Sequence, residues 1–211
     1  MDWQALFYNF VTVLVVLDPV GTSTVFGTLT ANLDAKYRRQ MAQRATFLAG
    51  AILFVFAFAG AQLLRALSIQ LEAFRIAGGL MLFLLAIDMV FARPSGLRSV
   101  SPLENAESES RRDLTVFPLA FPLIAGPGAM TTVVLLMGRA HGDPLKVVTL
   151  LGVVLVVLAI LLTSFYAANG IRRVLGVTGS NVIGRVMGII LAALAVQFVL
   201  SGLLAVFRPP M

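Results

Sequence analysis

The sequence predicts an all-α membrane protein with six transmembrane helices arranged as a 3+3 inverted repeat. Hydrophobic residues make up 59% of the 211 residues, charged residues make up 12%, and the mean hydropathy is +0.94. A soluble domain has about 45–50% apolar and about 25% charged residues, so this composition fits a bilayer as the solvent. Six apolar segments reach the roughly 20 residues that a spanning helix needs. They cover residues 4–33, 45–64, 72–92, 115–138, 146–168 and 181–207, with boundaries good to a few residues.

The first segment is predicted to be a broken helix. Pro19 and Gly21 interrupt its apolar run directly after Asp18, and three hydroxyl residues follow, namely Thr22, Ser23 and Thr24. Pro removes a backbone N–H donor, and Gly lowers helix stability. We therefore expect the helix to unwind near 18–22. The second and third segments contain no proline and are expected to be continuous helices.

The fourth segment carries a matching interruption. Gly126, Pro127 and Gly128 stand inside it, and Thr131 and Thr132 follow. Two such breaks at corresponding places in two halves are typical of discontinuous helices that line a polar site in a transporter. The fifth and sixth segments contain no proline and complete the second half.

A polar stretch separates the two halves. Residues 94–113 are rich in charged and small polar side chains and have too little apolar content to form a core of their own. We therefore divide the chain into a first three-helix repeat at 1–93, a linker at 94–113 and a second three-helix repeat at 114–211. Three helices per half is an odd number, so a repeat of the halves must be inverted across the membrane.

Internal similarity between the halves supports this division. At a shift of 108 residues, Pro19 falls on Pro127, and Ser23 and Thr24 fall on Thr131 and Thr132. The two breaks therefore occupy equivalent positions in the predicted repeat.

Basic residues predict the orientation. Eleven Lys and Arg fall in or beside the 34–44, 93–113 and 169–180 loops, and five fall on the other side of the membrane. The positive-inside rule places the richer loops, including the 94–113 linker, in the cytoplasm. Both termini are then outside, and we expect a multi-pass protein of the inner (cytoplasmic) membrane.

The half-helix ends are the candidate binding groups. The amino end of a half-helix favours a carboxylate, and freed carbonyls at the end of the preceding half-helix suit an ammonium group, so a zwitterion such as an amino acid fits both. The alternative is a locally capped kink, because Ser and Thr can satisfy exposed N–H groups. The candidate substrate-binding residues are Gly21, Thr22, Ser23, Thr24, Gly126, Gly128, Thr131 and Thr132, with Pro19 and Pro127 as the helix breaks.

Asp18 is the candidate for coupling transport to a proton. A carboxylate inside a membrane segment is costly and marks ion or proton paths, and Asp18 adjoins the first break. Its alternative role is to cap the half-helix that begins after Pro19. Asp88, close to Arg93, is expected to pair with arginine at the interface instead.

Other classes of protein find no support in the sequence. The basic residues form no aromatic-interleaved stripe, which argues against a nucleic-acid partner. Cysteine is absent, and no Ser-His-Asp set, nucleotide loop or metal-ligand cluster occurs. We therefore expect neither an enzyme, a cofactor nor a metal.

Three motifs resemble those of the MarC family of inner-membrane proteins, which includes the SnatA-type transporters of small neutral amino acids. They are Asp18-Pro19-Val20-Gly21, residues 118–129 (PLAFPLIAGPGA), and the stretch from Gly188 to Phe198. The resemblance spans nearly the whole chain except the linker. It implies a six-helix inverted-repeat fold and proton-driven uptake of glycine or alanine. The chain departs from the family's usual first motif, in which Asn and Pro commonly occupy the places of Thr22 and Thr24.

Residues and resemblance together predict a secondary transporter of small neutral amino acids. It is expected to work by alternating access around a midplane site, with a proton or another ion as the coupling partner and the lipid bilayer as its surroundings. Two alternatives remain, an exporter of metabolites or toxic compounds and a non-transporting membrane scaffold. The sequence leaves the oligomeric state open.

Overall fold

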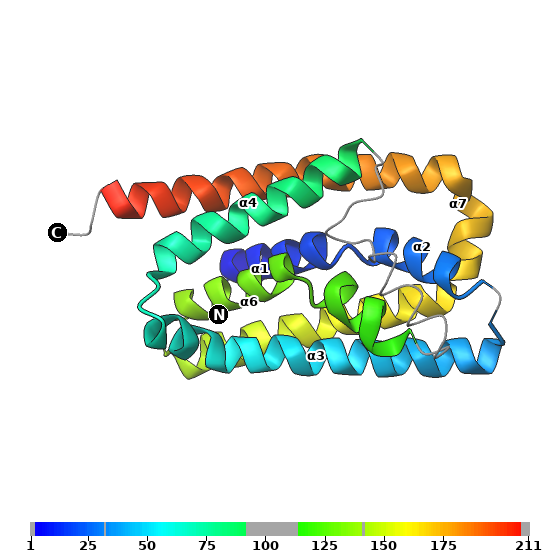
Figure 1. Cartoon of the computed structure of the whole chain (residues 1–211), viewed down its shortest axis with the longest axis horizontal. Helices are drawn as coiled ribbons and strands as arrows, with labels where there is room; N and C mark the ends of the chain where they lie inside the picture. Colours follow the sequence, from blue (N-terminus) through cyan, green and yellow to red (C-terminus); the bar gives the residue numbers. More distant parts are fainter. Residues whose placement is uncertain (1–2, 32, 92–113, 141, 208–211) are drawn as a thin grey trace.

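The computed structural model describes residues 3–31, 33–91, 114–140 and 142–207, and the regular structure within them is entirely helical. Figure 1 shows the elements in chain order. They are α1 (Trp3–Leu17), α2 (Pro19–Leu29), α3 (Ala35–Ala66), α4 (Leu71–Val90), the π-helix η1 (Thr115–Ile124), α6 (Pro127–Arg139) and α7 (Pro144–Phe207). The 94–113 linker and Arg93, the predicted partner of Asp88, lie outside the described residues.

The described helices confirm the all-α membrane fold. Five stretches are long and apolar enough to cross a membrane, and the bent pair η1–α6 raises the number to six. The five are Trp3–Leu29, Ala35–Ala66, Leu71–Val90, Pro144–Ala168 and Asn181–Phe207. Each half of the chain thus supplies one broken segment followed by two long spans, which is compatible with the inverted repeat; the symmetry itself stays a prediction.

Two helix boundaries differ from the prediction. Helix α3 begins at Ala35 rather than near 45, because the polar residues 35–44 are mostly strong helix formers such as Ala, Lys, Arg and Gln. The expected loop at 169–180 is helical and belongs to α7. Gly176, at φ 61°, is the residue with non-helical backbone angles in α7, and Gly adopts a positive φ without the steric penalty of a side chain. The chain therefore turns between its last two spans largely within helix.

The first break is confined to one residue. Helix α1 ends at Leu17 and α2 begins at Pro19, with Asp18 between them in the left-handed region (φ 45°, ψ 68°). Asp tolerates this region better than most residues because its short side chain bonds locally. Pro at the first position of α2 needs no donor there, since the first N–H groups of a helix have no intrahelical acceptor.

The second break is wider. Pro118 and Pro122 lie within η1, and the backbone angles of Phe117 and Phe121 are non-helical. Each proline lacks the N–H of a regular helix, and the chain winds with longer-range bonds such as Ala125 N to Ala120 O at 2.9 Å. Helices η1 and α6 meet at an angle of 54°. The prediction that the first and fourth segments are discontinuous is therefore confirmed.

The broken helices form the interior of the bundle. In Figure 1, α1, α2, η1 and α6 lie between α4 with the last part of α7 on one side and α3 with the first part of α7 on the other. The most apolar stretch of Trp3–Leu29 is 61% buried, against 22–33% for the other four stretches. The first break, with Asp18 1% exposed, is therefore surrounded by protein side chains, and Gly126 to Gly128 at the second break are half-buried.

Candidate functional site

The first break is closed by its own carboxylate. Asp18 is 1% exposed, and its Oδ1 accepts a hydrogen bond from the Gly21 N–H at 3.1 Å. A Cβ on Gly21 would lie only 2.1 Å from the other carboxylate oxygen, so the cap requires glycine at this position. The alternative reading of Asp18, as the cap of the second half-helix, therefore describes its geometry in this structure.

Thr22 supplies a hydrogen bond to the carbonyl that loses its helical donor at this break. In a continuous helix the Gly21 N–H would donate to the Leu17 carbonyl. Since Asp18 takes that donor, the Thr22 hydroxyl donates to the Leu17 oxygen instead, at 2.9 Å. The Ser164 hydroxyl of α7 lies 3.1 Å from the Pro19 carbonyl oxygen and 2.7 Å from the Leu161 carbonyl oxygen of its own helix, so its one hydrogen is shared between the break and α7.

The second break leaves its helix start open. Gly126 precedes α6 in an extended conformation, and no side chain caps the helix. Met130 is the first residue of α6 whose N–H donates to a backbone carbonyl four residues earlier, that of Gly126, at 3.0 Å. Among the residues that the structure describes, nothing accepts a hydrogen bond from the N–H groups of Gly128 and Ala129. The positive end of α6 is therefore free to bind an anion.

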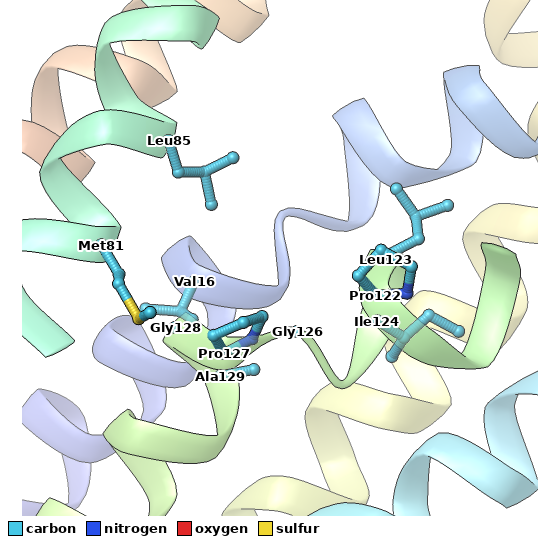
Figure 2. Close-up of a pocket in the computed structure, with 10 residues that line it drawn as sticks. All are labelled: Val16, Met81, Leu85, Pro122, Leu123, Ile124, Gly126, Pro127, Gly128 and Ala129. Carbon is cyan, nitrogen blue, oxygen red and sulfur yellow. The ribbon is translucent and has the colours of Figure 1, made fainter. Parts of the chain in front are cut away.

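A small cavity joins this open end to the first break. Figure 2 shows the link between η1 and α6 beside the last turn of α1, with α4 on the far side. The lining residues are Val16 of α1, Met81 and Leu85 of α4, Pro122 to Ile124 of η1, and Gly126 to Ala129. Val16 is two residues before Asp18, so the last turn of α1 before the first break borders the same cavity as the start of α6.

The backbone gives the cavity two electrical poles. On one side stands the amino end of α6, with the partial positive charge of its free N–H groups. On the other stands Val16, in the last turn of α1, and the neighbouring Val15 carbonyl lacks the helical donor that Pro19 cannot supply. A group that carries both a negative and a positive charge matches this pair of helix ends.

The cavity is closed to larger molecules in this conformation. Its volume is about 30 Å³, which suffices for one or two water molecules because each needs at least about 10–15 Å³. A Cβ on Gly128 would lie 2.5 Å from Cδ2 of Leu82 in α4. Helix α4 thus packs closely over the start of α6.

The structure divides the predicted site residues into two groups. Gly126, Pro127 and Gly128 line the cavity. The hydroxyls of Ser23 and Thr24 both donate to the Val20 carbonyl, at 2.8 and 3.0 Å. These two side chains therefore bond within their own helix.

The two threonines that follow the second break also point away from its helix start. Thr132 donates to the Gly128 carbonyl at 2.8 Å, and the side chain of Thr131 lies against Gly78 of α4. The suggestion that Ser and Thr hydroxyls cap the half-helices is therefore wrong. Asp18 caps α2, and α6 has no side-chain cap.

Several residues of the site were not predicted from the sequence, among them the neighbours of the two breaks that line the cavity, which are Val16, Pro122, Leu123, Ile124 and Ala129. Met81 and Leu85 line the cavity from α4, which has no break to draw attention to it. Ser164 contacts the first break from a position 145 residues away. A hydroxyl pair, Thr163-Ser164, within an apolar span was the only sequence feature that pointed to it.

The described residues contain no group of three or more His, Cys, Asp or Glu that could hold a metal. Asp88 lies near the end of α4 and is half-buried, away from the residues that line the cavity. Asp18 is therefore the acidic residue that adjoins the breaks.

Comparison with known proteins identifies the family. Residues 3–207 match the MarC family of integral membrane proteins. A UPF0056 membrane protein of Archaeoglobus fulgidus is 35% identical and covers 93% of this chain and 91% of its own length. YvbG of Bacillus subtilis is 33% identical with 98% of both chains covered, and YhcE of Escherichia coli is 31% identical with 98% of this chain and 95% of its own covered. No solved structure matches significantly. With its broken first and fourth segments and this full-length similarity, the chain belongs to the MarC family of integral membrane proteins.

Proposed function

We propose that this protein is a secondary transporter of small neutral amino acids that works by alternating access around the cavity between the two breaks. The observation that carries the proposal is the position of this cavity between the carboxyl end of α1 and the uncapped amino end of α6. An amino acid presents a carboxylate and an ammonium group at a separation suited to such opposed ends.

The two breaks take different parts in binding. Asp18 already places a carboxylate on the amino end of α2, so a second anion there is disfavoured by charge repulsion. The free N–H groups of Gly128 and Ala129 are the groups that bind the substrate carboxylate. The ammonium group then lies towards the Val15 carbonyl, whose helical donor is missing at Pro19.

The lining selects small and neutral side chains. No charged residue is among those that line the cavity, so a lysine or glutamate side chain finds no partner and pays for its desolvation without compensation. Gly126, Gly128 and Ala129 leave little room beside the helix start. A side chain of the size found in glycine, alanine or serine fits best.

Movement of the second break opens the site. The backbone of η1 departs from helical angles at Phe117 and Phe121, and Gly126 is extended. Non-helical points of this kind act as hinges in transporters built from discontinuous helices. Rotation of η1 or of α6 relative to α4 separates Gly128 from Leu82 and exposes the cavity to one side at a time.

Asp18 provides a route for coupling. As an ionised group it complements the positive end of α2, and protonation removes that charge while the site remains buried. Asp18 is the proposed coupling residue because its buried carboxylate lies at the first break, beside the end of α1.

Uptake into proteoliposomes tests the proposal. We expect labelled glycine or alanine to accumulate when a proton gradient is imposed, and unlabelled serine to compete while lysine and glutamate do not. Gly128→Val removes uptake, because the larger side chain meets Leu82 and fills the cavity. Gly152→Val is the matched control, since a Cβ at Gly152 meets no atom within 4 Å. Absence of uptake for every neutral amino acid, or competition by lysine and glutamate alone, contradicts the assignment.

A further inference from the structure

A second, larger cavity lies at the end of the bundle where α2 ends and α3 begins. Figure 1 shows both of these ends beside the bend of α7. The volume is about 340 Å³, and the lining includes Ala35, Arg38 and Arg39 of α3, Phe26 of α2, and Phe165 and Tyr166 of α7. None of these residues lines the cavity between the breaks.

Two arginines give this cavity a positive charge. Arg39 is exposed, and its guanidinium carbon lies 5.1 Å from the centre of the Tyr166 ring, which holds the group over the cavity wall. Arg38 is half-buried beside it. The structure shows no ion pair between either arginine and a carboxylate of the described residues. Within that part of the chain the planar guanidinium groups have no anionic partner, and their geometry suits phosphate oxygens.

The start of α3 adds to the positive potential. Ala35 is the first residue of this 32-residue helix, and Asp34 before it makes no side-chain cap bond. The first N–H groups and the positive end of the helix dipole therefore face the same region as the two arginines. Asp34 itself is exposed and does not line the cavity.

The remaining walls are apolar and lead towards lipid. The rings of Phe26 and Phe165 stack with their centres 4.5 Å apart and form one side of the cavity. Phe47, 81% exposed, follows Arg39 on α3 by about two turns and lies about 80° around the helix from it. An anionic group at the arginines can therefore continue into an apolar chain along the outside of α3.

We propose that this cavity binds the phosphate headgroup of an anionic phospholipid whose acyl chain runs along α3 past Phe47. Basic pockets between transmembrane helices are recognition sites for anionic headgroups. The cavity is at an end of the spans, which is where headgroups lie. A bound lipid contacts α2, α3 and α7 together and so holds the helix that follows the first break against its neighbours.

The proposal is tested on the purified full-length protein in a nonionic detergent, with phosphatidylglycerol, phosphatidylcholine or inorganic phosphate added. Native mass spectrometry counts retained lipids, and a thermal unfolding scan measures stabilisation. The variants are Arg38→Gln with Arg39→Gln, and Arg39→Gln alone. Arg65→Gln is the control because it removes one exposed charge near the other end of α3, where Arg65 bonds to the Ala61 carbonyl.

We expect phosphatidylglycerol to be retained and to raise the melting temperature of the wild type and of Arg65→Gln. Its affinity falls about fivefold for each arginine removed, which corresponds to about 1 kcal/mol per basic residue at a membrane surface. If the double variant does not fold, Arg39→Gln, which changes an exposed side chain, still gives the fivefold loss.

Three results overturn the proposal. Equal retention of phosphatidylglycerol by the wild type and by folded arginine variants removes the arginines from lipid binding. A shift with inorganic phosphate that matches the one with phosphatidylglycerol shows a site for free anions. Displacement of the lipid by alanine assigns the cavity to the transport route. The first two results leave the proposal of uptake through the cavity between the breaks untouched, whereas displacement by alanine counts against that cavity as the transport site.

Discussion

Substitutions at Asp18 separate the capping of α2 from the charge at the first break. Asp18→Asn keeps an oxygen that can accept from the Gly21 N–H and removes the charge. Asp18→Ala removes the accepting oxygen and the charge. It also puts alanine, whose side chain cannot hydrogen-bond to the nearby backbone, at φ 45°. Asp18→Gly removes the cap but suits the positive φ.

The magnitudes follow from these three features. Loss of a capping side chain to Ala costs about 0.5–2 kcal/mol, and the left-handed conformation costs about 1–2 kcal/mol for an ordinary residue. Asp18→Ala should therefore lower the free energy of unfolding by about 1.5–4 kcal/mol. Asp18→Gly loses only a few tenths of a kcal/mol of capping energy, on the order measured for such substitutions. Asp18→Asn loses the ion–dipole contribution, about 0.3–1 kcal/mol.

Unfolding in detergent measures the capping role of Asp18, and uptake into proteoliposomes measures its role in coupling. Unfolding in detergent should rank the wild type first, then Asp18→Asn and Asp18→Gly, with Asp18→Ala last. In proteoliposomes, Asp18→Asn should lose accumulation driven by a proton gradient and keep exchange of labelled for unlabelled substrate. Asp88→Asn serves as the control, because Asp88 is half-buried on α4 and does not line the cavity between the breaks.

Three results would contradict these assignments. Gradient-driven accumulation in Asp18→Asn equal to that of the wild type removes Asp18 from coupling and leaves its capping role intact. Unfolding of Asp18→Asn at the same temperature as Asp18→Ala refutes the assignment of stability to the cap and to the left-handed conformation. A loss of accumulation in Asp88→Asn as large as that in Asp18→Asn contradicts the distinction between the two carboxylates.

The remaining predictions concern glycines, one hydroxyl and the orientation. Gly126→Ala should prevent folding, because its Cβ would lie 2.4 Å from the Pro122 carbonyl oxygen. Gly128→Ala meets only the side chain of Leu82 and should fold but transport poorly. Size-exclusion profiles and uptake assays test this pair, and the prediction is contradicted if both variants fold well. Thr22→Val leaves the Leu17 carbonyl buried without its donor and should lower the free energy of unfolding by about 1–3 kcal/mol. Thr28→Val changes an exposed side chain and should alter the free energy of unfolding by no more than about 0.5 kcal/mol. Equal effects of the two variants in denaturant unfolding would refute the stabilising role of the bond from Thr22 to the Leu17 carbonyl. Alkaline phosphatase fused after residue 208 should be active and fused within 94–113 inactive, and the reverse pattern overturns the orientation.

The sequence by itself determined the class of the fold, the first break and the interruption at Gly126 and Pro127, but the non-helical points at Phe117 and Phe121 were not predicted. Composition alone required a bilayer, and the missing N–H of Pro19 and Pro127 interrupts a helix whatever packs around it. Such effects are local, because they depend on the covalent structure of a residue and of its neighbours. The same reasoning failed at 169–180, where polar residues and glycines suggested a loop and the chain remains helical.

Only the tertiary structure decided how each break is satisfied. The two interruptions look alike in sequence, yet Asp18 closes the start of α2 whereas the start of α6 is open. The donor from Ser164 and the walls from Met81 and Leu85 come from helices distant in sequence. Their positions depend on how α4 and α7 pack against the broken helices, and no local pattern records that arrangement, because packing joins residues whose spacing along the chain is arbitrary.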